Sequence, residues 1–236
     1  MKPPKTSTGT QQQSASPDLP FSLCPVSAGR PRAADAEARM HNLLSTAGRL
    51  FLEKGYNKVS LEMIAKEAHV AVRTIYVKFG GKAGLFAAVI STGRQHFFAT
   101  MDDLDTSMRP MREILFDFCV RFRDLVQSPG GINLHRMVIA EAQSSPELAI
   151  AFNAVGPQQT REILLRFFSR PDIRVQLRDD IPLAMLPVHL LNCILGDQLS
   201  RYLIEPETPP SAEETRQQVA YGLDLFLHGT LRPAAD

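Results

Sequence analysis

The amino-acid sequence predicts an all-α fold. Apolar residues recur at helical spacing along most of the chain, and no stretch alternates apolar and polar residues for long enough to indicate a β-strand. Turn-forming residues, mainly Pro and Gly, separate the helical stretches. With 236 residues, 44% of them hydrophobic, the chain can form one or two domains with packed cores.

The expected elements follow in order along the chain. Residues 1–29 are rich in Pro, Ser and Gln and poor in apolar side chains, so we expect a disordered tail there. The first helix ends near Gly55, and its apolar stripe consists of Leu43, Ala47, Leu50 and Phe51. We expect further helices at about 60–68, 71–79, 83–104, 110–127, 132–143, 146–170 with a break at Gly156-Pro157, 182–204 and 211–228.

The second and third helices are short and joined by a tight turn. Ser60 suits the N-cap of the helix at about 60–68, because its hydroxyl can accept a hydrogen bond from a backbone N–H. His69 falls at the turn, and His is among the residues that tolerate a left-handed backbone. Val70, Ile75 and Phe79 are spaced to fill the gap between the two helices. This pattern predicts a helix-turn-helix.

The second helix of this motif leaves one face free for a partner. That face carries donors, a hydroxyl and apolar groups suited to the major groove of DNA, namely Val72, Arg73, Thr74, Tyr76 and Lys78.

Charge is distributed unevenly along the chain. The whole chain has a net charge of only +1, yet residues 28–82 hold ten basic and five acidic side chains, a net charge of +5. Residues 1–27 contribute +1 and residues 83–236 contribute −5. A basic N-terminal part indicates an anionic partner that binds at one end of the molecule. An unevenly charged surface that is merely solvated is the alternative.

The stretch from residue 39 to residue 86 resembles the DNA-binding domain of TetR-family transcriptional regulators. The segments LFLEKGY, VSLEMIAKEA and RTIYVKFGGKAGLF match that family in order and spacing. Three positions depart from its pattern: His69 stands for the usual turn glycine, Ala71 for a capping Ser or Thr, and Gly84 for an acidic-type residue. The resemblance implies a DNA-binding domain at residues 30–82 and a ligand-binding and dimerisation domain at residues 83–236.

The resemblance also implies roles for individual residues. Tyr76 and Lys82 would contact phosphates, and Lys82 would do so beside the N-terminus of the fourth helix. Arg30 and Arg32 resemble a basic arm that enters the minor groove, although a solvated tail remains open. The candidate DNA-binding residues are Arg30, Arg32, Ser60, Val72, Arg73, Thr74, Tyr76, Lys78 and Lys82.

In this family the C-terminal helices bind ligand and form the dimer, and residues 134–168 resemble one C-terminal subgroup. Candidate ligand-binding residues are Phe97, Met101, Phe116, Cys119, Phe122, His135 and Phe152. Candidate dimer contacts are Leu186, Leu190, Ile194, Val219, Leu223 and Phe226. For both sets, ordinary packing inside a single chain is the alternative reading.

Other function classes find little support in the sequence. Gly80-Gly81-Lys82 lacks the rest of a phosphate-binding loop, and the acids near Asp102 lack the pattern of a calcium loop. Three widely separated cysteines form no metal-binding spacing, and no run approaches the roughly 18 apolar residues of a membrane span. We therefore expect no enzyme activity, no metal, no cofactor and no membrane partner, in a reduced, cytoplasmic protein.

The sequence thus predicts a homodimeric regulator, expected to be a repressor, that binds a near-palindromic double-stranded DNA operator. A small apolar ligand would release it from DNA. The alternative is a helical ligand-binding or protein-interaction module that has lost sequence-specific DNA binding, a reading favoured by His69 and Ala71.

Overall fold

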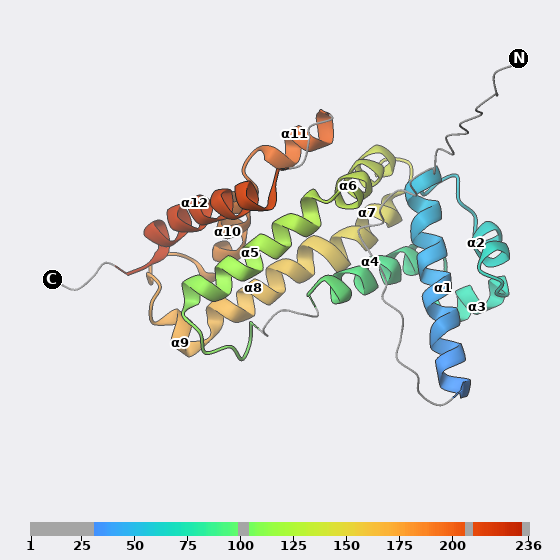
Figure 1. Cartoon of the computed structure of the whole chain (residues 1–236), viewed down its shortest axis with the longest axis horizontal. Helices are drawn as coiled ribbons and strands as arrows, with labels where there is room; N and C mark the ends of the chain where they lie inside the picture. Colours follow the sequence, from blue (N-terminus) through green and yellow to red (C-terminus); the bar gives the residue numbers. More distant parts are fainter. Residues whose placement is uncertain (1–30, 99–103, 206–209, 233–236) are drawn as a thin grey trace, which may run out of the picture.

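The computed structural model describes residues 31–98, 104–205 and 210–232, and within the first range it describes side chains for residues 35–95. In these ranges the chain forms twelve α-helices, one π-helical turn and one 3₁₀ turn, and no β-strand (Figure 1). The predicted all-α class is therefore confirmed. The expected disordered tail, residues 1–29, lies outside the described residues.

Four helices make up one end of the molecule. They are α1 (Pro31–Lys54), α2 (Leu61–Glu67), α3 (Val72–Phe79) and α4 (Lys82–Phe98), and α4 leads from this end into the rest of the structure (Figure 1). Each contributes a side chain that is at most 1% exposed, from Leu43 and Leu50 in α1, Ile64 in α2, Ile75 in α3 and Leu85 in α4. The first three helices and their turn thus have the core that the helix-turn-helix prediction requires.

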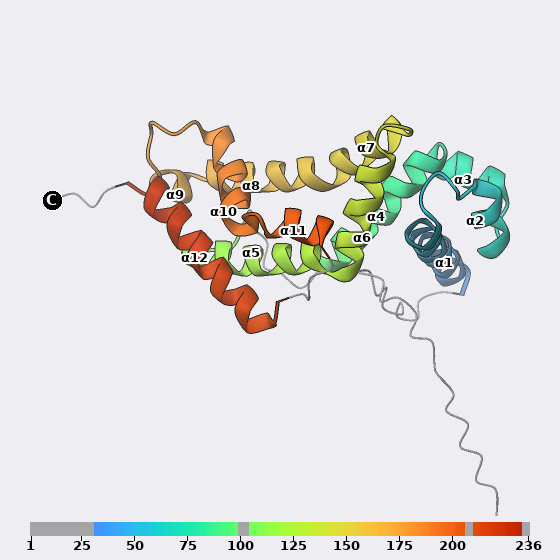
Figure 2. The same cartoon turned by 90° about the horizontal axis from the view of Figure 1, so that it is seen from above.

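The remaining helices form the longer part of the molecule. They are α5 (Met111–Gln127), α6 (Pro129–Glu141), α7 (Pro146–Asn153), α8 (Gln159–Ser169), α9 (Pro171–Arg174), α10 (Leu186–Leu195), α11 (Gln198–Ile204) and α12 (Ala212–Thr230). The α5 and α8 helices run lengthwise through this part, and α10 and α12 lie against α5 on one side of it (Figures 1 and 2). A second apolar core joins α5, α8, α10 and α12.

Two predicted helices differ from the structure. The expected break at Gly156-Pro157 does not occur, because residues 154–158 form a π-helical turn that joins α7 to α8. A proline ring clashes with the carbonyl four residues earlier in an α-helix, and a widened turn relieves that clash. The expected helix at 182–204 is instead two helices, α10 and α11, which are separated at Gly196 by a positive φ of 54°.

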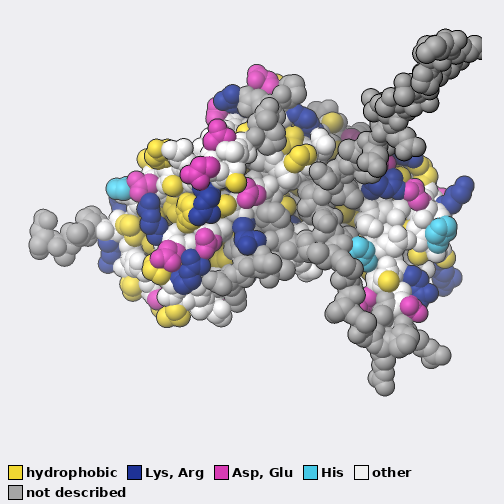
Figure 3. All heavy atoms as spheres, in the orientation of Figure 1, with side chains coloured by type: hydrophobic (Ala, Val, Ile, Leu, Met, Phe, Trp, Pro, Cys, Tyr) yellow, Lys and Arg dark blue, Asp and Glu magenta, His cyan; other side chains and the backbone are white. Residues whose placement is uncertain are grey.

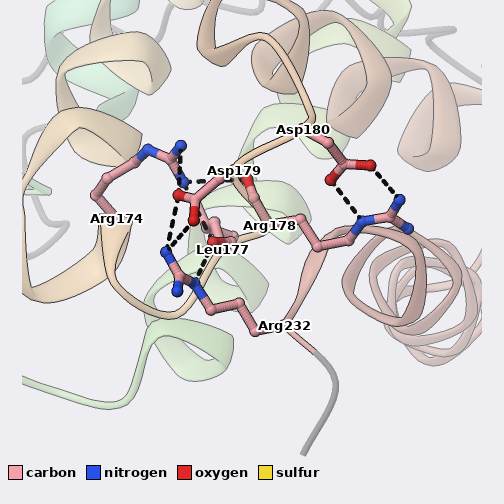
Figure 4. A network of polar contacts seen from close by, with 6 residues as sticks. All are labelled: Arg174, Leu177, Arg178, Asp179, Asp180 and Arg232. Carbon is pink, nitrogen blue, oxygen red and sulfur yellow. Dashed lines mark hydrogen bonds and ion pairs between the residues drawn. The ribbon is translucent and has the colours of Figure 1, made fainter.

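Polar contacts fasten the C-terminal end of α12 to the segment between α9 and α10 (Figure 4). Asp179 accepts from Arg232 at 2.7 Å and pairs with Arg174 at 3.1 Å. Backbone bonds join Arg178 N–H to Thr230 O and Arg232 N–H to Gln176 O, at 2.9 and 3.0 Å. These contacts hold the end of α12, while Tyr221 and Leu225 farther along the helix are each 69% exposed among the described residues.

Candidate nucleic-acid interface and ligand cavity

The turn between α2 and α3 is built as the sequence predicts. The Ser60 hydroxyl accepts a hydrogen bond from the Met63 N–H at 3.2 Å, which caps α2. His69 adopts a φ of +55°, the left-handed conformation expected of it, and Val70 N–H donates to Ala65 O at 2.9 Å. Ala71 occupies the N-cap of α3 without a side-chain hydrogen bond, so this helix begins uncapped.

The outer face of α3 carries part of the predicted set of residues. Arg73, Tyr76 and Lys78 are exposed, and Tyr76 is 55% exposed. Val72 and Thr74 are only partly exposed, and Val72 packs against the core of this end, which corrects its assignment to the free face. Val77, 75% exposed, was missed, although its position one turn after Arg73 places it on the same face.

The junction from α3 to α4 positions Lys82. Gly80 ends α3 with a φ of 73°, and a Cβ on Gly84 would lie 1.8 Å from Phe79 O, so only glycine lets α4 approach α3 this closely. Lys82 begins α4, and its ammonium lies 4.2 Å from the ring centroid of Tyr56, a cation–π contact. Burial lowers the pKa of Lys82, and burial together with nearby carboxylates raises the pKa of Tyr56 to about 12.

The structure describes only part of the predicted basic arm. Arg30 lies outside the described residues, and Arg32 lies in the first turn of α1, where the backbone is helical. Elsewhere on this end, exposed basic residues include Lys58, Lys66 and Lys78. Figure 3 shows Lys, Arg and His side chains along the outer rim of the end formed by α1–α3, with some acidic side chains among them, and basic and acidic side chains intermixed over the rest of the visible face.

A cavity of about 240 Å³ lies among α4, α5, α6, α7, α8, α10 and α11. Its walls are mainly apolar, with contributions from Ile90, Phe122, Leu125, Val126, Leu134, Phe152, Pro157, Leu191, Leu195 and Leu199. Three of the predicted ligand-binding residues, Phe122, His135 and Phe152, line it. The rings of His135 and Phe152 meet edge to face at 5.1 Å.

Two other predicted ligand-binding residues that the structure describes, Cys119 and Phe116, do not line this cavity. Cys119 is 0% exposed within the C-terminal core, where burial raises its pKa, so it packs as a small apolar residue. Phe116 packs against the same core, with the Arg216 guanidinium 4.9 Å from its ring centroid. The side chain of Phe97 and the whole of Met101 lie outside the described residues.

Polar groups gather at one part of the cavity wall. Arg94 donates to the Thr160 hydroxyl at 2.9 Å, and that hydroxyl donates to Gly156 O at 3.0 Å. Arg161, the next residue of α8, also lines the cavity. No motif in the sequence drew attention to Arg94, Thr160 or Arg161, because their meeting depends on how α4 and α8 pack.

His135 presents a defined face to the cavity. Its Nδ1 lies 2.7 Å from Gly131 O, so Nδ1 carries the proton and donates this bond. Burial lowers the pKa of His135, although the bond to Gly131 acts in the opposite direction. The neutral ring then leaves Nε2 as an acceptor.

The end of α6 is hydrogen-bonded to the loop that follows α1. The Asn57 N–H donates to Glu141 Oε2 at 2.7 Å, and the Asn57 side-chain amide donates to the Ser144 hydroxyl at 2.8 Å. A Cβ on Gly55, whose φ is +85°, would lie 2.6 Å from Glu141 Oε1. The helix that carries His135 in the cavity wall is therefore also bonded, less than two turns away, to the end formed by α1–α3.

The comparisons with known proteins match both parts of the chain. The description "Bacterial regulatory proteins, tetR family" matches residues 43–89, and "AefR-like transcriptional repressor, C-terminal domain" matches residues 113–229. The chain belongs to the TetR family of transcriptional regulators. The helix-turn-helix of this regulator is therefore a DNA-binding element.

One curated relative of the TetR-family chain is the HTH-type transcriptional repressor NicS of Pseudomonas putida. The two are 28% identical over 137 residues, which cover 53% of this chain and 62% of NicS. The match thus spans less than two thirds of the relative. The proteins matched by sequence are described as regulators of transcription rather than as enzymes.

Solved structures share the fold of this regulator. The Flavonoid-responsive Regulator FrrA is 24% identical, with a TM-score of 0.68 over 84% of this chain and 100% of that one. A TetR transcriptional regulator from Agrobacterium tumefaciens is 20% identical, with a TM-score of 0.66 over 82% and 94%. At these identities the likeness establishes the fold alone.

The predicted dimer contacts of the regulator lie in its own core. Leu186, Leu190, Ile194, Val219, Leu223 and Phe226 are each at most 3% exposed within a single chain. The alternative reading, packing inside one chain, is the correct one for these six residues. Tyr221 and Leu225 of α12 are both 69% exposed and lie one turn apart on its outer side.

None of the described helices is long and apolar enough to cross a membrane.

Proposed function

We propose that this TetR-family regulator is a repressor that binds operator DNA as a homodimer and leaves it when a small, mainly apolar molecule fills the cavity. The observation that carries this proposal is that the same helices serve both sites. The α4 helix starts against the end of α3 at Lys82, and its residues Ile90 and Arg94 line the cavity. The α6 helix carries His135 at the cavity and Glu141 at the DNA-binding end.

Release follows from differential binding. A ligand that binds more tightly to the arrangement in which α4 and α6 hold the two α3 helices away from their DNA spacing shifts the population toward that arrangement. The cavity and its mostly apolar wall support a ligand with a large hydrocarbon part. Repression, as opposed to activation, is supported by the descriptions of the matching C-terminal domain and of NicS.

The homodimer is proposed to form through the outer side of α12. Tyr221 and Leu225 supply exposed apolar surface there, and α10 packs beside α12. A two-fold pair of this kind would offer two α3 helices to successive major grooves, about 34–36 Å apart. Two half-sites related by the same two-fold axis make the operator a near-palindrome.

The alternative, a module that no longer reads DNA, is not favoured. His69 adopts the left-handed turn that the motif requires, and the face of α3 retains exposed Arg73, Tyr76 and Lys78. The missing cap at Ala71 leaves the start of α3 less stabilised, by about 1 kcal/mol relative to a Ser or Thr cap. That cost is below the roughly 1.5–3 kcal/mol that burial of the Ile75 side chain contributes to holding α3 in place.

The test is a titration of the full-length protein against DNA from its own promoter region, at about 50 and 200 mM salt. We expect sequence-selective binding that weakens steeply at the higher salt concentration, with a matched random duplex bound far more weakly. Equal, weak binding to both duplexes would contradict operator recognition. A thermal-shift screen of small apolar compounds on the same protein then tests for a ligand.

A further inference from the structure

The cavity wall specifies more about the ligand than its apolar character. Resting on the proposed function, we propose that the ligand is an amphipathic acid, with a hydrocarbon body and a carboxylate that the guanidinium groups of Arg94 and Arg161 bind. Both residues line the cavity, Arg94 from α4 and Arg161 from α8. The rest of the wall is suited to the hydrocarbon body.

The sign of charge in the wall is one-sided. Of the described residues that line the cavity, two are arginines and none is Asp or Glu. Within a largely apolar space, charges interact more strongly than they do in water. A carboxylate is therefore attracted and an ammonium group repelled, while a neutral group of the same size gains neither effect.

Arg161 is the side chain available to bind a carboxylate. It is partly buried at the cavity, and the part of the chain that the structure describes offers it no hydrogen bond or ion pair. A planar guanidinium binds a carboxylate through two parallel hydrogen bonds, which fixes the ligand's orientation as well as its charge.

Arg94 is held in place by its neighbours. Its bond to the Thr160 hydroxyl, and the bond from that hydroxyl to Gly156 O, join the guanidinium to the π-helical turn. Such π-helical turns are frequent at functional sites. Here the turn brings Pro157, Thr160 and Arg161 to one cavity wall. A cation fixed before the ligand arrives loses less conformational entropy on binding.

Three probes of one shape test the inference: octanoate, octanamide and octylammonium. Their affinities for the full-length protein are measured by calorimetry near neutral pH, with 2-naphthoate and 2-naphthamide as a second, rigid pair. We expect each carboxylate to bind roughly ten- to a hundredfold more tightly than its amide, as a charge-assisted hydrogen bond implies. Octylammonium should be the weakest of the three.

Substitutions then locate the effect. Arg161→Gln should remove most of the preference for octanoate over octanamide while leaving the affinity for octanamide unchanged, and Arg161→Lys should retain part of it. Arg166→Gln is the matched control, because Arg166 lies on the same helix, does not line the cavity, and pairs at the surface with Asp105. Its octanoate preference should equal that of the unmodified protein.

Equal binding of acids and amides, a preference for octylammonium, binding of none of the five probes, or a preference that survives Arg161→Gln would each overturn the inference. A second readout, the fluorescence anisotropy of labelled promoter DNA, separates its failure from that of the proposed function. If acids bind through Arg161 but DNA stays bound, the cavity chemistry is right and ligand release is wrong. If octanamide releases DNA as well as octanoate does, release is right and the acid preference is wrong.

Discussion

At the scale of single residues, Arg73 and Lys82 are expected to act differently on DNA. Arg73 is exposed on α3, so Arg73→Ala should relax base discrimination and cost about 1–3 kcal/mol at the cognate site. Lys82→Ala should weaken binding to every sequence. It should also reduce the slope of log affinity against log salt concentration by about one unit. Titration of cognate and random duplexes at several salt concentrations measures both. If Arg73→Ala weakens the two duplexes equally, Arg73 contacts phosphate and not a base.

His135 predicts a pH dependence of stability. Because its pKa is lowered in the folded protein, the unfolded chain binds more protons below about pH 6.5. This contribution to stability is fully present above the unfolded pKa and is lost as the pH falls through the lower, folded pKa. We expect the Tm to fall between pH 7.5 and pH 5, and His135→Gln to flatten that fall.

The control for this prediction is His189→Gln, which removes an exposed histidine from α10. It should leave the pH dependence as it is in the unmodified protein. A His135→Gln variant with an unchanged pH dependence would show that other groups account for the loss of stability in acid.

The residues that the sequence could identify are those whose role depends on near neighbours. The roles of Ser60 as a helix N-cap and of His69 in the turn could be predicted because a cap and a turn depend on residues nearby in sequence. The structure confirms both roles. Arg94 and Arg161 lie 67 positions apart, and only the packing of α4 and of α8 against the π-helical turn brings them to one cavity. No spacing in the sequence reports such a meeting.

At the scale of elements, the contact between the end of α6 and the loop after α1 is expected to transmit the ligand signal. Glu141→Ala removes the acceptor for the Asn57 N–H, so the cavity and the DNA-binding end can move more independently. We expect the difference in DNA affinity with and without ligand to shrink by about 0.5–2 kcal/mol. Anisotropy titrations with and without a ligand from the thermal-shift screen measure this difference.

Glu162→Ala is a matched loss of a carboxylate away from this contact, since Glu162 is exposed on α8 and accepts a hydrogen bond from the Gln158 side chain on the same helical stretch. It should leave the ligand effect intact. If Glu141→Ala also leaves it intact while DNA is still bound, α4 alone carries the signal.

The proposed dimer forms through the outer side of α12, so a substitution there tests it. Leu225→Glu places a charge on an exposed apolar position, so we expect sedimentation to report monomers and circular dichroism to report unchanged helix content. The same change at Leu223, which is 0% exposed, should instead unfold the C-terminal core. Ile150→Glu, at a position of equal exposure on α7, is the control that should stay dimeric.

Apolar stripes in the sequence predicted these helices well but not what covers them. The stripe through Val219 and Leu223 marks a buried face, and burial by α5 and α10 produces the same pattern as burial by a second chain. The same limit applies to Gly196 and Pro157. Gly196 separates two helices although the apolar pattern continues across it, whereas Pro157 lies within a helical turn and does not end it. Backbone geometry at such positions depends on neighbouring helices.

At the scale of the whole molecule, the separation of charge affects the orientation and the salt dependence of DNA binding. The DNA-binding segment has a net charge of +5 and residues 83–236 have −5, so the phosphate backbone attracts one end and repels the other. A monomer would bind DNA through one basic DNA-binding segment, whereas a dimer would bind through two. Counterion release then makes the salt slope of the dimer about twice that of the monomeric Leu225→Glu variant on the same operator.

The proposed dimer would also make half-site spacing a constraint, because two α3 helices fixed to one body reach two major grooves only on the same face of the duplex. Inserting about five base pairs between the half-sites turns one groove away by half a helical turn, and an insertion of about ten turns it back. We expect the first insertion to reduce affinity to that of a single half-site and the second to recover part of it only if the body can stretch. The Leu225→Glu monomer should bind all three duplexes alike. Titration of these duplexes at one salt concentration decides the matter: a parent dimer indifferent to the five-base-pair insertion would mean that each α3 reads its half-site without a rigid partner.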